Sequence, residues 1–238
     1  MTETPVSAEP QIAARGHVAL HLAHRWFAFF EAPGGDLDAH LMMFHPQVRL
    51  SGNRGSHLFA RDHASLVEWF SAIPDAVSSH HIVHSSYSTA DNGDGLLNLV
   101  VAYQAPGNPD MHGSIISYET RIEYASGTPR FSSLDKTPIL PNKRLDYETS
   151  WSVNRVLSWV HAELGGITES DGQLRAALGN DVRQVCAQAT AAEGSDGYSA
   201  IVTAVGGHPM GVRGVRLEFA DDVRTIMPAV TKIELLAT

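Results

Sequence analysis

The chain has little cysteine, no cluster of basic residues and no long hydrophobic run. Its single cysteine, Cys186, excludes an internal disulfide and a zinc site built from thiolates. The formal net charge is -9 at pH 7, and no Lys/Arg cluster offers the basic surface that binds nucleic-acid phosphates or anionic lipids. No apolar run approaches the length of about 18 to 20 residues that crosses a bilayer. We therefore expect neither a nucleic acid nor a membrane as a partner.

The opening stretch MTETPVSAEPQ also lacks the features of an export signal. It has neither a basic n-region nor an apolar h-region, and it is rich in Pro, Thr, Ser and Glu. We expect residues 1–11 to be a disordered tail and the protein to be cytoplasmic. With 43% hydrophobic and 18% charged residues, the chain has a globular composition, and its 238 residues allow one large domain or two small ones.

Apolar residues at spacings of three and four predict an amphipathic helix over residues 12–31. The stripe consists of Val18, Leu22, Trp26, Phe29 and Phe30, and the stretch APGGD ends it. A shorter helix is expected over DLDAHLMMF, where Asp36 or Asp38 can cap the first turn, followed by the strand QVRLSG. The stretch RDHASLVEWFSAI predicts a third helix, which ends at Pro74.

The rest of the first half has the pattern of strands separated by turns. The expected strands cover residues 79–89, 95–104, 112–124 and 130–137, and the turns are DNGDG, APGNPD and SGTP. Helices followed by a run of strands indicate an α+β fold with a curved antiparallel sheet wrapped over the helices.

After Pro141 the pattern begins again. SVNRVLSWVHAEL predicts a helix, and Val182 and Arg183 repeat Val48 and Arg49 at an offset of about 134 residues. A helix over GYSAIVTAVGG and strands near residues 212–220 and 225–236 would complete this half, without a counterpart of residues 112–137. We therefore predict a tandem repeat with an incomplete second copy: a domain at 12–140, a linker at 141–150 and a shortened domain at 151–238. The first domain or another subunit should cover its sheet edge, and we expect a homodimer.

The first half resembles the SnoaL-like branch of the nuclear transport factor 2-like superfamily. The resemblance rests on the element order and on the stretches HRWFAFFEA, DLDAHLMMFHPQVRL, SHHIVHSSYSTADNGDG and SYETRIEYASGTPRFSSLDKTPI, within residues 17–139. It implies a cone-shaped α+β barrel with a deep apolar pocket at its open end. Activity stays open, because the superfamily includes polyketide cyclases, ketosteroid isomerases, scytalone dehydratase, epoxide hydrolases, oxygenase subunits and noncatalytic adaptors. The aspartate that acts as the base in ketosteroid isomerases has no counterpart, because this chain has Ser51 and Gly52 at the end of the first strand.

Three histidines fall close together in SSHHIVHSSYS. On a strand, His80 and His84 would share a face about 13 Å apart while His81 points to the other face, so they do not converge on a metal. We expect no metal and no cofactor. By resemblance, His81 matches a histidine of the dehydratase-like members that points into the pocket, where it could shuttle a proton. The alternative is a histidine hydrogen-bonded in a half-buried strand.

The other candidate residues complete a hypothetical site. Glu31 could assist His81 as a buried base with a raised pKa, or be solvated, and Tyr118 could stabilise an oxyanion, or be a core tyrosine. Asp135 and Lys136 are interpreted as a surface ion pair. Candidate substrate-binding residues form the walls and rim of the pocket: Trp26, Phe30, Phe44, His45, Trp69, Tyr103 and His112.

Two main hypotheses follow for the function. The first is a cofactor-free enzyme of the dehydratase, isomerase or cyclase type, which acts by acid/base proton transfer on a small apolar oxygenated molecule. The second is a noncatalytic module of the same fold that binds a small ligand or serves in assembly. A subunit of a larger oxygenase is a third hypothesis.

Overall fold

The helix predicted over residues 12–31 is present and begins earlier, at Ala8 (α1, Ala8–Glu31), so the expected tail is helical from residue 8 onward. The computed structural model describes residues 8–31, 36–72, 78–104, 113–125, 127–143, 151–168, 172–179, 181–191, 198–206, 211–220 and 229–236. Residues 1–7, His112 and residues 144–150 of the expected linker lie outside the described residues.

Six strands of the first half form one curved sheet in the order β2-β1-β6-β5-β4-β3. They are β1 (Phe44–Gly52), β2 (His57–Ala60), β3 (Ser79–Thr89), β4 (Gly95–Gln104), β5 (Gly113–Glu123) and β6 (Arg130–Lys143). All pairs are antiparallel except β1 with β6, which run parallel. Register shifts within β3, β5 and β6 act as bulges, which bend a sheet. The predicted α+β fold with a curved sheet over helices is thereby confirmed.

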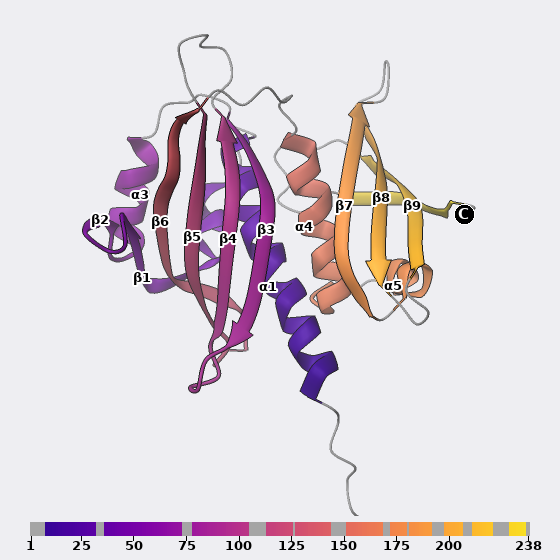
Figure 1. Cartoon of the computed structure of the whole chain (residues 1–238), viewed down its shortest axis with the longest axis horizontal. Coiled ribbons are helices and arrows are strands. Elements are labelled where there is room, and N and C mark those ends of the chain that lie inside the picture. Colours follow the sequence, from indigo (N-terminus) through magenta and orange to yellow (C-terminus); the bar gives the residue numbers. More distant parts are fainter. Residues whose placement is uncertain are drawn as a thin grey trace, which may run out of the picture.

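The concave face of this sheet packs on three helices: α1, α2 (Leu37–Leu41) and α3 (His63–Ser71). Figure 1 shows α1 crossing behind the sheet and α3 beside its β1 and β2 end. The core joins the helices to the strands through fully buried side chains, among them Phe27, Phe44, Leu66, Leu97 and Ile122. Asp62 begins α3 with a capping box, because its carboxylate accepts from the Ser65 backbone nitrogen while Ser65 Oγ accepts from the Asp62 nitrogen.

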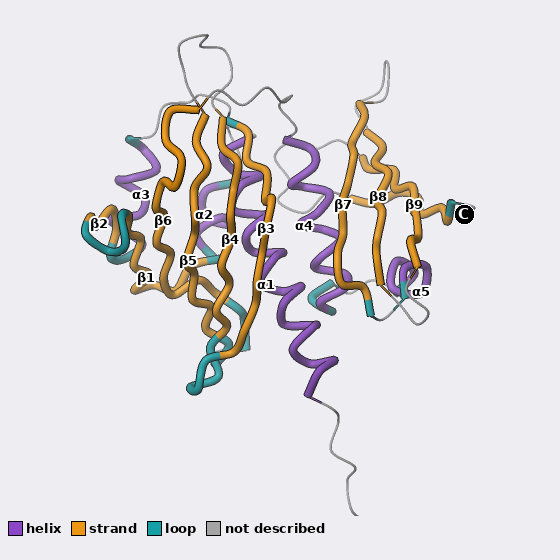
Figure 2. The backbone as a smooth tube through the Cα atoms, viewed as in Figure 1, coloured by secondary structure: helices purple, strands orange, loops and turns teal. Residues whose placement is uncertain are grey.

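The second half builds a separate layer. It consists of α4 (Trp151–Gly165), α5 (Gln173–Leu178) and a meander of β7 (Val182–Ala191), β8 (Tyr198–Gly206), β9 (Gly211–Ala220) and β10 (Ala229–Leu235). Figures 1 and 2 show α4 between β3 of the first sheet and β7 of the second. The helix predicted over GYSAIVTAVGG is wrong: this stretch is β8, in which Ala200, Val202 and Ala204 alternate into the core.

The two layers meet where α1 packs on α4, and this interface is polar. His24 Nδ1 donates to Asn154 Oδ1 at 2.6 Å, and His21 Nδ1 donates to the Ser158 backbone oxygen at 2.9 Å. His17 Nδ1 lies 2.9 Å from His161 Nδ1. We call His17, His21, His24 and His161 the histidine interface. Burial is the main cause that lowers the pKa of His21 and of His24 to about 4, so these side chains are neutral at pH 7.

Among the described helices, none is both long enough and apolar enough to cross a membrane.

Candidate functional site

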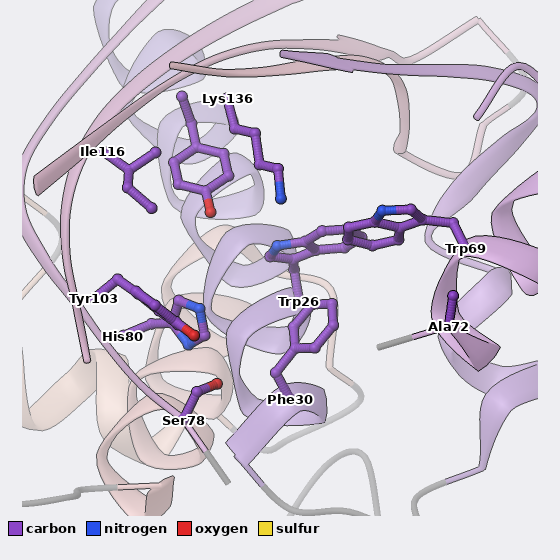
Figure 3. A pocket seen from close by; sticks show the side chains of 10 residues that line it. Trp26, Phe30, Trp69, Ala72, Ser78, His80, Tyr103, Ile116 and Lys136 are labelled. Carbon is purple, nitrogen blue, oxygen red and sulfur yellow. The ribbon is translucent and has the colours of Figure 1, made fainter. Parts of the chain in front are cut away.

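A cavity of about 360 Å³ opens between the concave face of the first sheet and helices α1 and α3. Figure 3 shows its lining side chains converging from helices and strands. The lining residues are Trp26, Phe30, Trp69, Ala72, Ser78, His80, Tyr103, Ile116, Tyr118 and Lys136.

Aromatic rings form one wall of the cavity. Trp26 and Phe30 stand one helical turn apart on α1, and Trp69 comes from α3. The two indole rings lie 7° from parallel with centroids 6.2 Å apart, and the edge of Phe30 meets Trp26 at 5.1 Å. Two near-parallel indole rings offer a flat apolar surface of the kind that stacks with a planar ligand.

Polar groups stand on the strands opposite. His80, at the start of β3, stacks on Phe27 at 4.8 Å and lies 5.1 Å from the ring of Tyr103. Burial raises the pKa of Tyr103, and burial and then Tyr103 raise the pKa of Tyr118. Both phenols therefore keep their protons at neutral pH and can donate hydrogen bonds to an oxygen in the cavity.

The cavity also contains a cation. Lys136 Nζ lies 4.8 Å from the ring centroid of Phe59 and 5.0 Å from that of Trp69, within cation–π distance. Burial lowers the pKa of Lys136. The expected ion pair with Asp135 is wrong, because the two residues occupy opposite faces of β6. Asp135 instead accepts hydrogen bonds from Ser51, Thr137 and the backbone nitrogens of Arg54 and Gly55.

The structure brings five of the predicted site residues together at this cavity: Trp26, Phe30, Trp69, Tyr103 and Tyr118. Phe44 lies in the core instead, with its ring edge-on to Trp26 at 5.0 Å. His45 is half-buried and its Nε2 lies 3.7 Å from Glu123 Oε2, away from the cavity lining. The side chain of Glu31, and all of His112, lie outside the described residues.

The histidine strand differs from simple alternation. Val83 is unpaired between the partners Ile82 with Val101 and His84 with Val100, which makes it a bulge. Ile82 and Tyr87 both pack on the core, whereas His84 is exposed, so the prediction that His80 and His84 share a face is wrong. His80 lines the cavity. Alternation places the side chain of His81 on the opposite face of the sheet, and His81 is absent from the lining.

Sequence reasoning missed three polar lining residues: Ser78, His80 and Lys136. Lys136 stands two residues after Leu134, which is buried in the core, and a strand period of two would have turned both side chains inward. The sequence pattern favours a structural role for His80 and excludes it from a metal site. No group of three or more His, Cys, Asp or Glu side chains that could hold a metal ion occurs within the described part of the chain.

No family model and no curated protein matches this sequence. Several solved structures are similar to about half of the chain. An NTF2-like protein from Pseudomonas putida is 10% identical, with a TM-score of 0.43 over 57% of this chain and 96% of that chain. ActVI-ORFA from Streptomyces coelicolor is 14% identical, with a TM-score of 0.38 over 52% of this chain and 96% of that chain. The CamKII hub homology domain from Chlamydomonas reinhardtii is 10% identical, with a TM-score of 0.40 over 51% and 98%.

Proposed function

We propose that the cavity binds a small, flat, largely apolar molecule that carries a carbonyl oxygen, and that His80 moves a proton on it. The observation that carries this proposal is the placement of His80 with the phenols of Tyr103 and Tyr118 in one cavity walled by Trp26 and Trp69. Aromatic walls bind the apolar body of such a molecule, while a few polar groups fix its orientation. The reaction class is a lyase or isomerase reaction of the dehydratase or cyclase type.

The chemistry follows from the protonation states. The imidazole of a histidine can accept a proton from the carbon next to a carbonyl through one ring nitrogen and return it. The electron pair left on carbon becomes an enolate, whose oxygen the protonated phenols stabilise by hydrogen bonding. Return of the proton to another carbon completes an isomerisation. Its transfer to a departing hydroxyl group releases water and completes a dehydration.

In this proposal the proton-transfer role expected for His81 belongs to His80, because His80 lines the cavity and its neighbour does not. The two residues provide a matched pair of variants, since His80→Gln and His81→Gln make the same chemical change on opposite faces of one strand.

One observation favours the noncatalytic alternative, a module that binds a ligand without converting it. No carboxylate stands among the lining residues that the structure describes, so the cavity has His80 and Lys136 as its only titratable groups besides the two tyrosines. Many acid/base enzymes orient their catalytic histidine with an acidic residue. A site with one histidine and no such partner has fewer catalytic groups than these enzymes.

Exchange of carbon-bound hydrogen with deuterated water can test both proposals without a known product. Acetophenone and 1-tetralone serve as probes, with binding followed by ligand-observed NMR and exchange at the carbon next to the carbonyl followed by loss of its proton signal. Catalysis predicts exchange that His80→Gln abolishes and His81→Gln retains. Binding without exchange supports the noncatalytic module. If neither probe binds, the cavity does not hold molecules of this class and the proposal fails.

We also propose that residues 151–238 are a shortened second copy and that the protein forms a homodimer. The order of a long helix followed by a four-stranded meander supports the copy, because β7 to β10 pair in the same sequence as β3 to β6. This topology matches β7 with β3 rather than with β1, so β9 and β10 match β5 and β6, against the expectation that residues 112–137 have no counterpart. Sedimentation or light scattering of the full chain tests the dimer, which a monodisperse monomer would exclude.

A further inference from the structure

We infer that the natural ligand of this cavity carries a negatively charged oxygen, a carboxylate or a phenolate, on a flat ring, and that Lys136 selects it. The inference rests on the proposed role of the cavity as a binding site and names the class of ligand that the site takes. Its basis is the charge and hydrogen-bonding character of the lining.

Lys136 extends into the cavity from β6, where it pairs with Tyr118 of β5 on one side and Gly52 of β1 on the other. Figure 3 shows its side chain directed from the strand toward the paired indole rings of Trp26 and Trp69. The amine therefore stands beside the aromatic wall, at a place where a ring stacked on that wall would bring its substituent within reach.

This ammonium group has no acidic partner among the described residues. Asp135, its neighbour in sequence, lies on the other face of the sheet, where Ser51, Thr137 and the backbone nitrogens of Arg54 and Gly55 occupy its carboxylate. The contacts recorded for Nζ are with the rings of Phe59 and Trp69. These two cation–π contacts offset only part of the free energy that removal of an ammonium group from water costs.

The other polar groups of the lining are hydrogen-bond donors in their neutral states. Tyr103 and Tyr118 keep their phenol protons, and Ser78 has a hydroxyl group. A cavity that combines a cation with three hydroxyl donors and has no carboxylate in its described lining is complementary to an electron-rich, negatively charged oxygen. The same arrangement would disfavour a cationic ligand, which would leave these donors unmatched.

Matched pairs of aromatic ligands separate the effect of ligand charge on affinity from the effect of ligand shape. Benzoate and 2-naphthoate are ionised at pH 7.5, while benzamide and 2-naphthamide are neutral and of nearly the same size. We expect the wild-type protein to bind each acid at least about 10-fold more tightly than its amide, since a buried charge-assisted hydrogen bond contributes about 1.5 to 3 kcal/mol. The Lys136→Met variant should remove this preference and keep the binding of the amides.

Lys232→Met provides the control, because it removes the same charge from an exposed position on β10, where Lys232 pairs with Glu218 and Glu234. This variant should keep the preference. A second readout needs no ligand: Lys136→Met should melt at the same temperature as the wild type or higher, because it replaces an ammonium group without an acidic partner by an apolar chain of similar length.

Four outcomes overturn the inference. Equal binding of acid and amide by the wild type would show that the cavity does not select charge, and the proposed function would stand. If Lys136→Met still binds the acids more tightly than the amides, another group selects the charged ligand. A marked fall in the melting temperature of Lys136→Met would show that the ammonium serves the fold. Binding of none of the four compounds would overturn the proposed function together with this inference.

Discussion

The indole rings of Trp26 and Trp69 lie 7° from parallel at a centroid distance of 6.2 Å, although they come from different helices. The contact between these rings joins α1 to α3 beside the first sheet. The two rings form the flat wall of the cavity. Because both rings line the cavity, a ligand that stacks there should change the tryptophan fluorescence of the protein.

A Trp69→Phe variant should bind aromatic ligands about 5- to 10-fold more weakly than the wild type, since aromatic contacts contribute about 0.5 to 1.5 kcal/mol beyond the area they bury. It should also lose much of the ligand-induced quenching. Trp159→Phe is the control, because Trp159 packs against Phe219 in the second layer. Fluorescence titration with 2-naphthoate measures both effects. Equal loss of quenching in the two variants would contradict the stacking of a ligand on this wall.

The phenol of Tyr118 should matter for chemistry more than for binding. If it hydrogen-bonds an enolate oxygen, Tyr118→Phe should slow hydrogen exchange of 1-tetralone about 100-fold, in the range for removal of one oxyanion donor, with little change in affinity. Tyr87→Phe removes a hydroxyl of the same kind outside the cavity, where Tyr87 Oη donates to Tyr124 at 3.3 Å, and should retain the wild-type rate. A rate in Tyr118→Phe equal to that of Tyr87→Phe would remove Tyr118 from the mechanism.

The histidine interface should make the protein sensitive to acid. Burial holds the pKa of His21 and of His24 at about 4 in the folded state, against about 6.5 in the unfolded state, so the unfolded chain binds more protons between these values. The free energy of unfolding should therefore have its full value above pH 6.5 and decrease as the pH falls toward 4. A pKa shift of this size corresponds to a loss of about 3 kcal/mol of unfolding free energy for each histidine, once the pH is below both pKa values.

Urea unfolding at a series of pH values measures this dependence. His24→Asn should have a lower unfolding free energy at pH 7, because the hydrogen bond to Asn154 is altered, and a shallower decline between pH 6.5 and 4.5. The slope that remains reflects His17, His21, His161 and the buried His40, whose pKa values burial also lowers. His84→Asn, at an exposed histidine, should keep the wild-type slope. A pH-independent wild type would show that these histidines are solvated in solution.

The sequence predicted the first sheet well because its strands obey simple rules. The four strands of the meander alternate apolar and polar residues between glycine-rich turns, and the structure has them as β3 to β6. The aromatic stripe of α1 predicted the wall of the cavity, since residues three and four apart share a helix face. Five of the candidate site residues accordingly line one cavity.

Three features of the structure could not be predicted by such rules. The bulge at Val83 shifts alternation within β3, and nothing in SSHHIVHSSYS marks where the extra residue falls. The segment GYSAIVTAVGG has apolar residues that fit a helix or a buried strand, and its neighbours in the sheet decide for the strand β8. The histidines of α1 face a helix more than a hundred residues away, so their partners could not be read from local spacing.

Asn154 connects the second layer to the proposed catalytic strand. Its Nδ2 donates to the backbone oxygen of His80 at 2.6 Å, and its Oδ1 accepts from His24 at 2.6 Å. Since all these groups are buried, Asn154→Ala leaves a donor and an acceptor without this partner and should lower the free energy of unfolding by about 1 to 3 kcal/mol. The same change loosens the start of β3, so we expect weaker ligand binding and slower hydrogen exchange.

The rate effect distinguishes positioning from stability alone. Val156→Ala also truncates a buried side chain of α4, but one in the core of the second layer, and should destabilise the protein by about 1 to 3 kcal/mol without a change in exchange rate when both variants are fully folded. Exchange of 1-tetralone at a temperature well below both melting points makes the comparison. If Asn154→Ala and Val156→Ala exchange at the wild-type rate, the second layer does not position His80, and Asn154 contributes to stability only.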